Sequence, residues 1–128
     1  MSIKRINVDG LMKLEAFSHA VVAGDFIYVS GSLGTVGETV DLAEGGTAGQ
    51  TTQVLKNIAG ILAGCDASMS DVVKMNVFLS DMDTFGEMNE SYMAFMGDNP
   101  PARITVGKAG LALGAAVEID CIAYKKSA

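Results

Sequence analysis

Residues 18–31 read Ser-His-Ala-Val-Val-Ala-Gly-Asp-Phe-Ile-Tyr-Val-Ser-Gly, two runs rich in β-branched and aromatic residues that meet at Gly24-Asp25. Such residues favour strands, and glycine readily adopts the positive φ that a tight hairpin turn needs. The stretch therefore predicts a β-hairpin. Glycine, acidic and small residues dominate positions 32–46, where little periodicity remains. We expect that segment to be mostly loop.

Two amphipathic helices are expected downstream of the hairpin. The first lies between residues 47 and 64, where Thr47 and Gln50 have the spacing of a capping box and Gly64 is a suitable end. Its apolar residues recur with helical spacing at Val54, Leu55, Ile58, Ile61 and Leu62. The second begins at Asp83 or Thr84 and ends before Pro100. Its apolar stripe comprises Phe85, Met88, Tyr92, Phe95 and Met96.

Three more strands are predicted over residues 71–80, 102–106 and 115–124, from their β-branched and aromatic content. The order is hairpin, helix, strand, helix, strand, strand, and no repeat or linker divides the chain. We therefore predict one α+β domain over residues 1–128, with two helices on one face of a mixed sheet. A chain of this length has no third layer for the other face. We expect an oligomer that packs these faces together.

Charge and composition narrow the function classes. Nine basic against 15 acidic residues give a net charge of −6, which disfavours nucleic acid as a partner because phosphate contacts need basic patches. Cys65 and Cys121 are too few for a disulfide framework, and no basic and apolar leader opens the chain. The longest apolar stretch, residues 54–63, is far short of a membrane span. We expect a cytoplasmic protein with reduced thiols and no membrane partner.

Several catalytic motifs are absent or weak. One histidine, with cysteines at positions 65 and 121, does not suit a metal site. His19 lies in the predicted hairpin, which favours a structural role over assistance to a nucleophile. The glycines at 31, 34 and 37 lack the G-x-G-x-x-G pattern and the lysine of phosphate-binding loops. We therefore expect neither a metal nor a nucleotide cofactor.

Arg103 and Glu118 are the strongest candidates for chemistry. Arg103 enters a short strand of small and apolar residues, where a buried arginine needs an anion. Its planar fork suits a substrate carboxylate, and a structural salt bridge to an acidic side chain is the alternative. Glu118 lies between apolar neighbours in the last predicted strand. It is either that partner or a carboxylate of raised pKa that holds a water.

The residues around these two positions resemble a known family. Pro101-Ala102-Arg103 and Val117-Glu118-Ile119 are similar to the C-terminal signature of the RidA (YjgF/YER057c/UK114) family of enamine/imine deaminases. The hairpin over residues 20–31 also resembles that of the family. Further matches cover residues 50–61, 71–79 and 89–92. The resemblance thus extends over nearly the whole chain.

The resemblance implies a chorismate-mutase-like α+β fold that assembles as a homotrimer with a barrel-like centre and three clefts between subunits. It also implies hydrolysis of reactive 2-imino acids and their enamines, 2-aminoacrylate among them, to 2-keto acids and ammonia. Neither a metal nor an organic cofactor is implied. The cellular role would be the control of metabolite damage, since such intermediates harm the pyridoxal-phosphate enzymes that release them.

Site residues follow from the resemblance position by position. Arg103 matches the arginine that holds the substrate carboxylate, and Glu118 matches the glutamate that positions or activates the attacking water. The resemblance implies further substrate-binding positions at Phe17, Ser30, Gly31, Asn89 and Thr105, of which Gly31 and Thr105 offer backbone groups.

The chain departs from the family pattern in several places. Phe17 replaces a cleft tyrosine, Ser32-Leu33-Gly34 a Gln-aliphatic-Pro run, Ile104 a smaller residue and Ala112 a proline. These positions bear on the preferred substrate, so another imine such as 2-aminomuconate stays open. A different class of function is a trimer that binds a small carboxylate for regulation, or acts in a chaperone-like way, without turnover. A ribonuclease is disfavoured by the acidic net charge.

Overall fold

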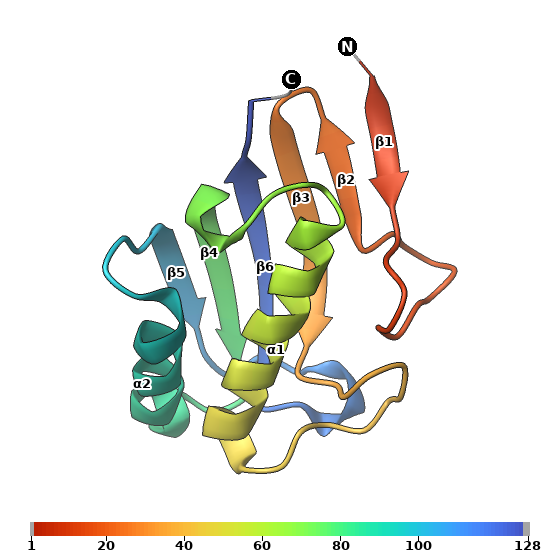
Figure 1. The fold of residues 1–128 in the computed structure, drawn as a ribbon. Coiled ribbons are helices and arrows are strands. Elements are labelled where there is room, and N and C mark those ends of the chain that lie inside the picture. Colours follow the sequence, from red (N-terminus) through yellow and green to blue (C-terminus); the bar gives the residue numbers. More distant parts are fainter. Residues whose placement is uncertain (1, 127–128) are drawn as a thin grey trace.

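The computed structural model describes residues 2–126, which form a six-stranded sheet with two helices on one face (Figure 1). The strands lie in the order β1-β2-β3-β6-β4-β5. β4 and β5 are parallel, and the other neighbours are antiparallel. The predicted mixed α+β sheet is therefore confirmed. The strands are β1 Ile3–Ile6, β2 Ala20–Ala23, β3 Phe26–Leu33, β4 Val72–Leu79, β5 Ala102–Val106 and β6 Val117–Tyr124.

The core lies between the sheet and the helices α1 (Gly46–Ala63) and α2 (Phe85–Met96), which pack against each other (Figure 1). The predicted apolar stripe of α1 is buried. Alternate residues of the central strand β6 face the same layer, since a strand points successive side chains to opposite faces. Each buried aliphatic side chain contributes roughly 1.5–3 kcal/mol to the stability of the fold. This packing holds β6 in place, and Glu118 projects from its other face.

The structure corrects the predicted capping of α1, although the helix starts at Gly46, one residue from the predicted Thr47. Gly45 precedes the helix with a φ of 102°, and no side chain caps it. The Gln50 side chain instead accepts a hydrogen bond from the Ala116 backbone N–H at 2.8 Å, which ties α1 to the segment before β6. The capping box of Thr47 and Gln50 is therefore wrong, because a tertiary contact uses the glutamine. Gly64 ends the helix as predicted.

Some short elements were not expected from the sequence. β1 pairs with β2 at the sheet edge, although its residues are mostly exposed and carry no strong strand pattern. Three short 3₁₀ turns are present, η1 Met69–Asp71, η2 Met82–Thr84 and η3 Ala112–Gly114. The last of these contains Leu113 in the left-handed region, with a φ of 61°. Bulky residues rarely adopt this conformation.

The sheet face opposite the helices carries large exposed side chains. Phe26, Tyr28 and Tyr124 form an aromatic cluster there, with ring centroids 5.3 Å apart for Phe26 and Tyr124. Ile104 and Val106 of β5 are also exposed. Exposed apolar side chains that gather on one sheet face favour an interaction surface.

The two cysteines lie in different environments. Cys121 is buried in β6, as expected for a small core residue, and burial raises the pKa of its thiol to about 12. Cys65 is half-buried just after α1, and burial raises the pKa of its thiol as well. Within residues 2–126, no helix is both long and apolar enough to cross a bilayer.

Candidate active site

Arg103 lies on the edge strand β5 and points toward α2. Its register partner on β4 is the core residue Met75, so both side chains lie on the helix-covered face. The guanidinium carbon is 4.7 Å from the centre of the Tyr92 ring and 5.7 Å from that of Phe85. Its Nη1 donates to Asn89 Oδ1 at 2.8 Å. Two aromatic rings and one amide oxygen therefore hold the guanidinium in place.

The charge of Arg103 is not matched by the chain itself. Within residues 2–126, no carboxylate lies within ion-pair distance of its guanidinium. Within the described part of one chain, Arg103 and Glu118 therefore form no salt bridge with each other. Asn89 occupies one of the five N–H donors, and the others suit a bidentate carboxylate.

Two buried hydroxyls flank this position. In the described part of the chain, neither Tyr92 Oη nor Thr105 Oγ1 has a hydrogen-bond partner. Burial raises the pKa of Tyr92, and the charge of Arg103 opposes that rise. Thr105 lies two residues beyond Arg103 on the same face of β5. The structure thus brings Arg103, Asn89 and Thr105 together as one group, which we call the arginine group.

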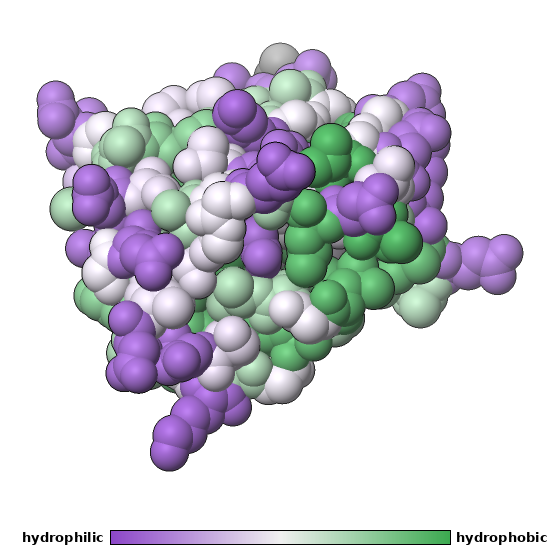
Figure 2. All heavy atoms as spheres, turned by 90° about the horizontal axis from the view of Figure 1, so that it is seen from below, coloured by the Kyte–Doolittle hydropathy of each residue, from purple (hydrophilic) through white to green (hydrophobic). Residues whose placement is uncertain are grey.

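A second group surrounds a cavity of about 490 Å³. Phe17, Ser30, Gly31 and Glu118 all line it, together with loop residues that are largely apolar. We call these four residues the glutamate group. Several of the cavity's loops lie at the lower end of the molecule in Figure 1, and apolar side chains gather on one half of that end in Figure 2.

Glu118 and Gly31 are fitted to each other. A Cβ atom on Gly31 would overlap Glu118 Oε2, so the absence of a side chain leaves room for the carboxyl group. Burial, with a smaller effect from the charge of Asp120, raises the pKa of Glu118 above its ordinary value. An upward shift of this kind is typical of a carboxyl group that acts as a general acid or base.

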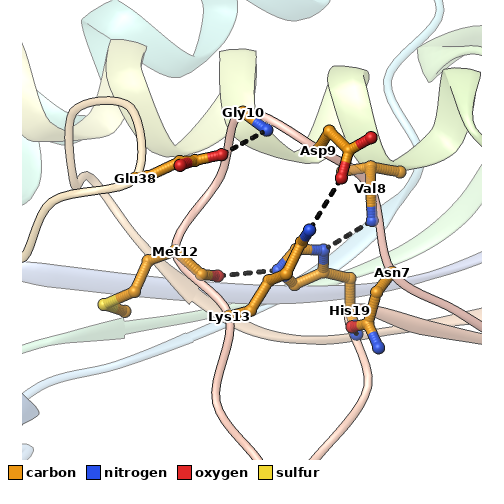
Figure 3. Close-up of polar contacts among 8 residues, drawn as sticks. All are labelled: Asn7, Val8, Asp9, Gly10, Met12, Lys13, His19 and Glu38. Atoms are coloured by element: carbon orange, nitrogen blue, oxygen red, sulfur yellow. Dashed lines mark hydrogen bonds and ion pairs between the residues drawn. The ribbon is translucent and has the colours of Figure 1, made fainter.

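His19 fastens the loop that forms one wall of the cavity (Figure 3). Its Nδ1 accepts a hydrogen bond from the Val8 backbone N–H at 3.0 Å, so Nε2 carries the proton and donates to the Met12 carbonyl at 2.7 Å. Its backbone N–H donates to Asn7 Oδ1 at 3.0 Å. Both ring nitrogens are thus engaged, and His19 has the structural role that we expected. It lies one residue before β2, not within a strand.

A further contact joins this loop to the next one. The Gly10 backbone N–H donates to Glu38 Oε2 at 3.1 Å, and Lys13 pairs with Asp9 at 2.7 Å (Figure 3). Leu11, Leu14 and Phe17 of the same loop line the cavity. The contacts of Gly10 and Lys13 thus tie down the loop that carries them.

The two groups do not meet within one chain. Glu118 pairs in register with Phe78 on the face opposite the helices, whereas Arg103 points toward α2. β4 also lies between the strands that carry them. The expected site residues are thus divided into two groups on opposite faces of one sheet.

Sequence reasoning missed two features of these groups. Tyr92 was expected only as a core residue, yet its ring supports the guanidinium of Arg103. Leu113 lines the cavity through a left-handed turn that its sequence does not indicate. Its neighbour Gly114, also at positive φ, is the only local signal of such a turn.

Within residues 2–126, the chain combines an α+β sheet, an arginine without a carboxylate partner and a glutamate that lines a cavity. The model of the family described as endoribonuclease L-PSP matches residues 9–125. The rat protein named 2-iminobutanoate/2-iminopropanoate deaminase is 42% identical over 112 residues, which cover 86% of this chain and 80% of the rat protein. The chain therefore belongs to the endoribonuclease L-PSP family, which includes the RidA and UK114 proteins that its sequence resembles.

Solved structures of relatives share the fold. RidA from the Antarctic bacterium Psychrobacter has a TM-score of 0.88 at 38% identity, covering 94% of this chain and 98% of that one. TdcF of E. coli with bound serine also has a TM-score of 0.88, at 25% identity, covering 96% of this chain and 99% of that one. The chain therefore has the Rid-family fold over almost its whole length.

Proposed function

We propose that this protein hydrolyses reactive 2-imino acids and their enamines, such as 2-aminoacrylate, to 2-keto acids and ammonia. The observation that carries the proposal is the arginine group. Its half-buried guanidinium has no carboxylate partner within residues 2–126, which keeps donors free for a substrate carboxylate. The name of the rat relative supports the reaction class, and the serine in the TdcF structure supports a ligand with an α-carboxylate.

Glu118 supplies the acid and base of this proposal. From the protonated imine, its carboxylate takes a proton from the water that attacks the imine carbon, which forms a neutral carbinolamine. That proton then passes to the nitrogen. As the C–N bond breaks and the C=O bond forms, the Glu118 carboxylate accepts the hydroxyl proton, and ammonia and a 2-keto acid remain. A glutamate of raised pKa suits both steps, because it holds a proton more readily than an ordinary glutamate does and can pass it on. This chemistry needs no metal or organic cofactor.

The complete site would form between copies of the chain. Since the arginine and glutamate groups lie on opposite faces, we propose a homotrimer in which the arginine group of one copy faces the glutamate group of the next. The exposed apolar sheet face supports such an assembly, because packing it against other copies removes it from water. The damage-control role and a cytoplasmic location belong to the same proposal.

The test is 2-keto acid release from imines that an amino-acid oxidase generates in situ. Arg103→Ala should lower kcat/KM at least about 100-fold, since two charge-assisted hydrogen bonds to the substrate carboxylate are lost. Arg103→Lys keeps the charge but not the fork and should recover only part of the loss. Arg5→Ala removes the chain's only other arginine and serves as the matched control. Full activity of a folded Arg103→Ala protein would contradict the proposal.

Carboxylate binding without turnover is the second candidate. The TdcF structure supports this candidate, because it contains bound serine, a small carboxylate. This candidate would be favoured over the deaminase if calorimetry showed that the protein binds 2-ketobutyrate while it does not accelerate the hydrolysis of any imine.

A further inference from the structure

The cavity beside Glu118 is lined by apolar side chains that remain exposed. Leu14, Phe17, Val40 and Leu113 come from three different loops, and each exposes between 46% and 58% of its surface. Large apolar side chains that converge on a cavity mark a binding site for an apolar group.

Most polar side chains of the cavity are already engaged. Ser30 Oγ donates to the Ser18 carbonyl at 2.6 Å, and Ser32 Oγ donates to the Ser30 carbonyl at 2.9 Å. Asn57 Nδ2 donates to the Thr35 carbonyl at 2.9 Å, and both ring nitrogens of His19 are used. These groups have little left to offer a ligand. Glu118 is therefore the acid in a cavity that otherwise favours hydrocarbon.

The size of the cavity exceeds the needs of the smallest imines. Its volume of about 490 Å³ lies within the range typical of ligand sites. In liquid water, on the order of fifteen molecules occupy that volume. The imino group and carboxylate of a 2-imino acid need only a small part of it, so most of the space remains for a substrate side chain.

Leu113 holds an unusual conformation at this cavity. Its φ of 61° and ψ of 16° are unfavourable for a bulky residue, and half of its surface is exposed. Strained residues that persist in a fold cluster at ligand sites. Contact with an apolar substrate side chain would give this exposed leucine a partner.

We propose that the cavity takes the substrate side chain, so that the protein prefers 2-imino acids with branched or long apolar side chains, and that Leu113 is a main determinant of this preference. This inference rests on the proposed function and names its substrate class. The imino acid derived from leucine is a fitting substrate, whereas that derived from alanine leaves the cavity empty.

The first test compares the imines of leucine, alanine and glutamate. The kcat/KM for the leucine imine should exceed that for the alanine imine by roughly 10-fold or more, as expected for a hydrophobic side-chain pocket. The glutamate imine should be the poorest, because a buried charge has no partner in the cavity. Equal or better use of the alanine imine would overturn the inference while leaving the deaminase activity established.

Leu113→Asn tests the residue itself. Asparagine tolerates the left-handed conformation, so this variant changes polarity more than backbone. The ratio of kcat/KM for the leucine imine to that for the alanine imine should fall several-fold. Lys108→Asn is the matched control, because Lys108 also has a positive φ of 55° but does not line the cavity. An unchanged preference in Leu113→Asn would remove Leu113 from the inference.

A binding measurement keeps the inference testable even if no imine is hydrolysed. Calorimetry on the wild-type protein would compare 4-methyl-2-oxopentanoate with pyruvate, two keto acids that differ only in the side chain. Tighter binding of the former by roughly 10-fold supports the apolar pocket, whatever the outcome for turnover. Equal affinities, or a cavity closed by a neighbouring copy so that neither binds, would overturn it.

Discussion

The arginine and glutamate groups solve opposite problems on the two faces of one sheet. Aromatic rings and an amide oxygen hold the cation of Arg103, with donors to spare. Loops around Glu118 instead build a mostly apolar cavity that raises the pKa of its acid. One group suits an anion, and the other suits an uncharged reacting centre with an apolar tail. A 2-imino acid contains both parts, and neither group alone accommodates the whole molecule.

Removal of the acid should have the largest effect on the glutamate group. We expect Glu118→Gln to lower kcat for keto-acid release by about 100- to 10,000-fold, the usual contribution of a positioned general acid or base. Substrate binding should change much less, because Arg103 is intact. Glu90→Gln replaces an exposed carboxyl on α2 and should retain wild-type activity. A similar loss in that control would show that the effect is not specific to Glu118.

Mixing the two inactive variants tests whether the groups meet across copies. If Arg103→Ala and Glu118→Gln chains are unfolded together and refolded at equal amounts, about a quarter of the sites in a cyclic assembly contain both native groups. Activity should return toward that fraction of the wild-type value. Co-refolded chains that stay as inactive as the separate variants would show that the division between copies is wrong.

Gly31→Ala should have an intermediate effect, confined to the glutamate group. The added methyl group would displace the Glu118 carboxyl, and a shift of about 1 Å can cost roughly 100-fold in rate. We expect a 10- to 100-fold fall in kcat, because this is the range that such misplacement produces. Gly110→Ala meets open space and is the control. An active Gly31→Ala enzyme would mean that the position of Glu118 is not critical.

Asn89→Ala should have a smaller effect, confined to the arginine group. The hydrogen bond from Arg103 is lost, but the aromatic rings of Phe85 and Tyr92 remain. We expect KM to rise about 3- to 10-fold with kcat nearly unchanged, in line with the worth of one hydrogen bond. A fall in kcat at constant KM would instead place Asn89 near the reacting atoms.

The smallest expected effect is on stability. Because burial raises the pKa of Glu118, the folded state binds its proton more tightly than the unfolded state does. The ionised group therefore destabilises the fold above its folded-state pKa, and this penalty disappears as the pH falls below the ordinary value. Glu118→Gln should raise the Tm at pH 7 by no more than about a few degrees. Thermal unfolding at pH 4 and pH 7 should show a smaller gain at the lower pH.

The pH dependence of activity should also reflect the raised pKa of Glu118. A carboxylate base of raised pKa is lost on acidification at a higher pH than an ordinary glutamate would be. The acid limb of kcat should therefore lie above the ordinary range of a glutamate, and a limb within that range would contradict the assigned cause.

The elements of the fold were largely predictable, whereas the shape of the site was not. Hydrophobic periodicity located both helices and the central strands, because burial imposes it directly on the sequence. β1 and the capping of α1 were predicted wrongly, since β1 is an exposed edge strand and Gln50 bonds Ala116 instead of the helix N-terminus. The family resemblance named Arg103 and Glu118. It did not reveal that they face opposite ways, because strand register is a tertiary property.

Because Cys121 is buried, the reactivity of its thiol can report on unfolding of the chain. A thiol with a pKa of about 12 in the core has almost no reactive thiolate at neutral pH, and reagents cannot reach it. Cys65, half-buried after α1, is the more accessible of the two thiols in the native state. A maleimide probe should therefore label Cys65 first and Cys121 only when the chain opens. The slow phase of that labelling counts global openings of the fold, without any engineered tag.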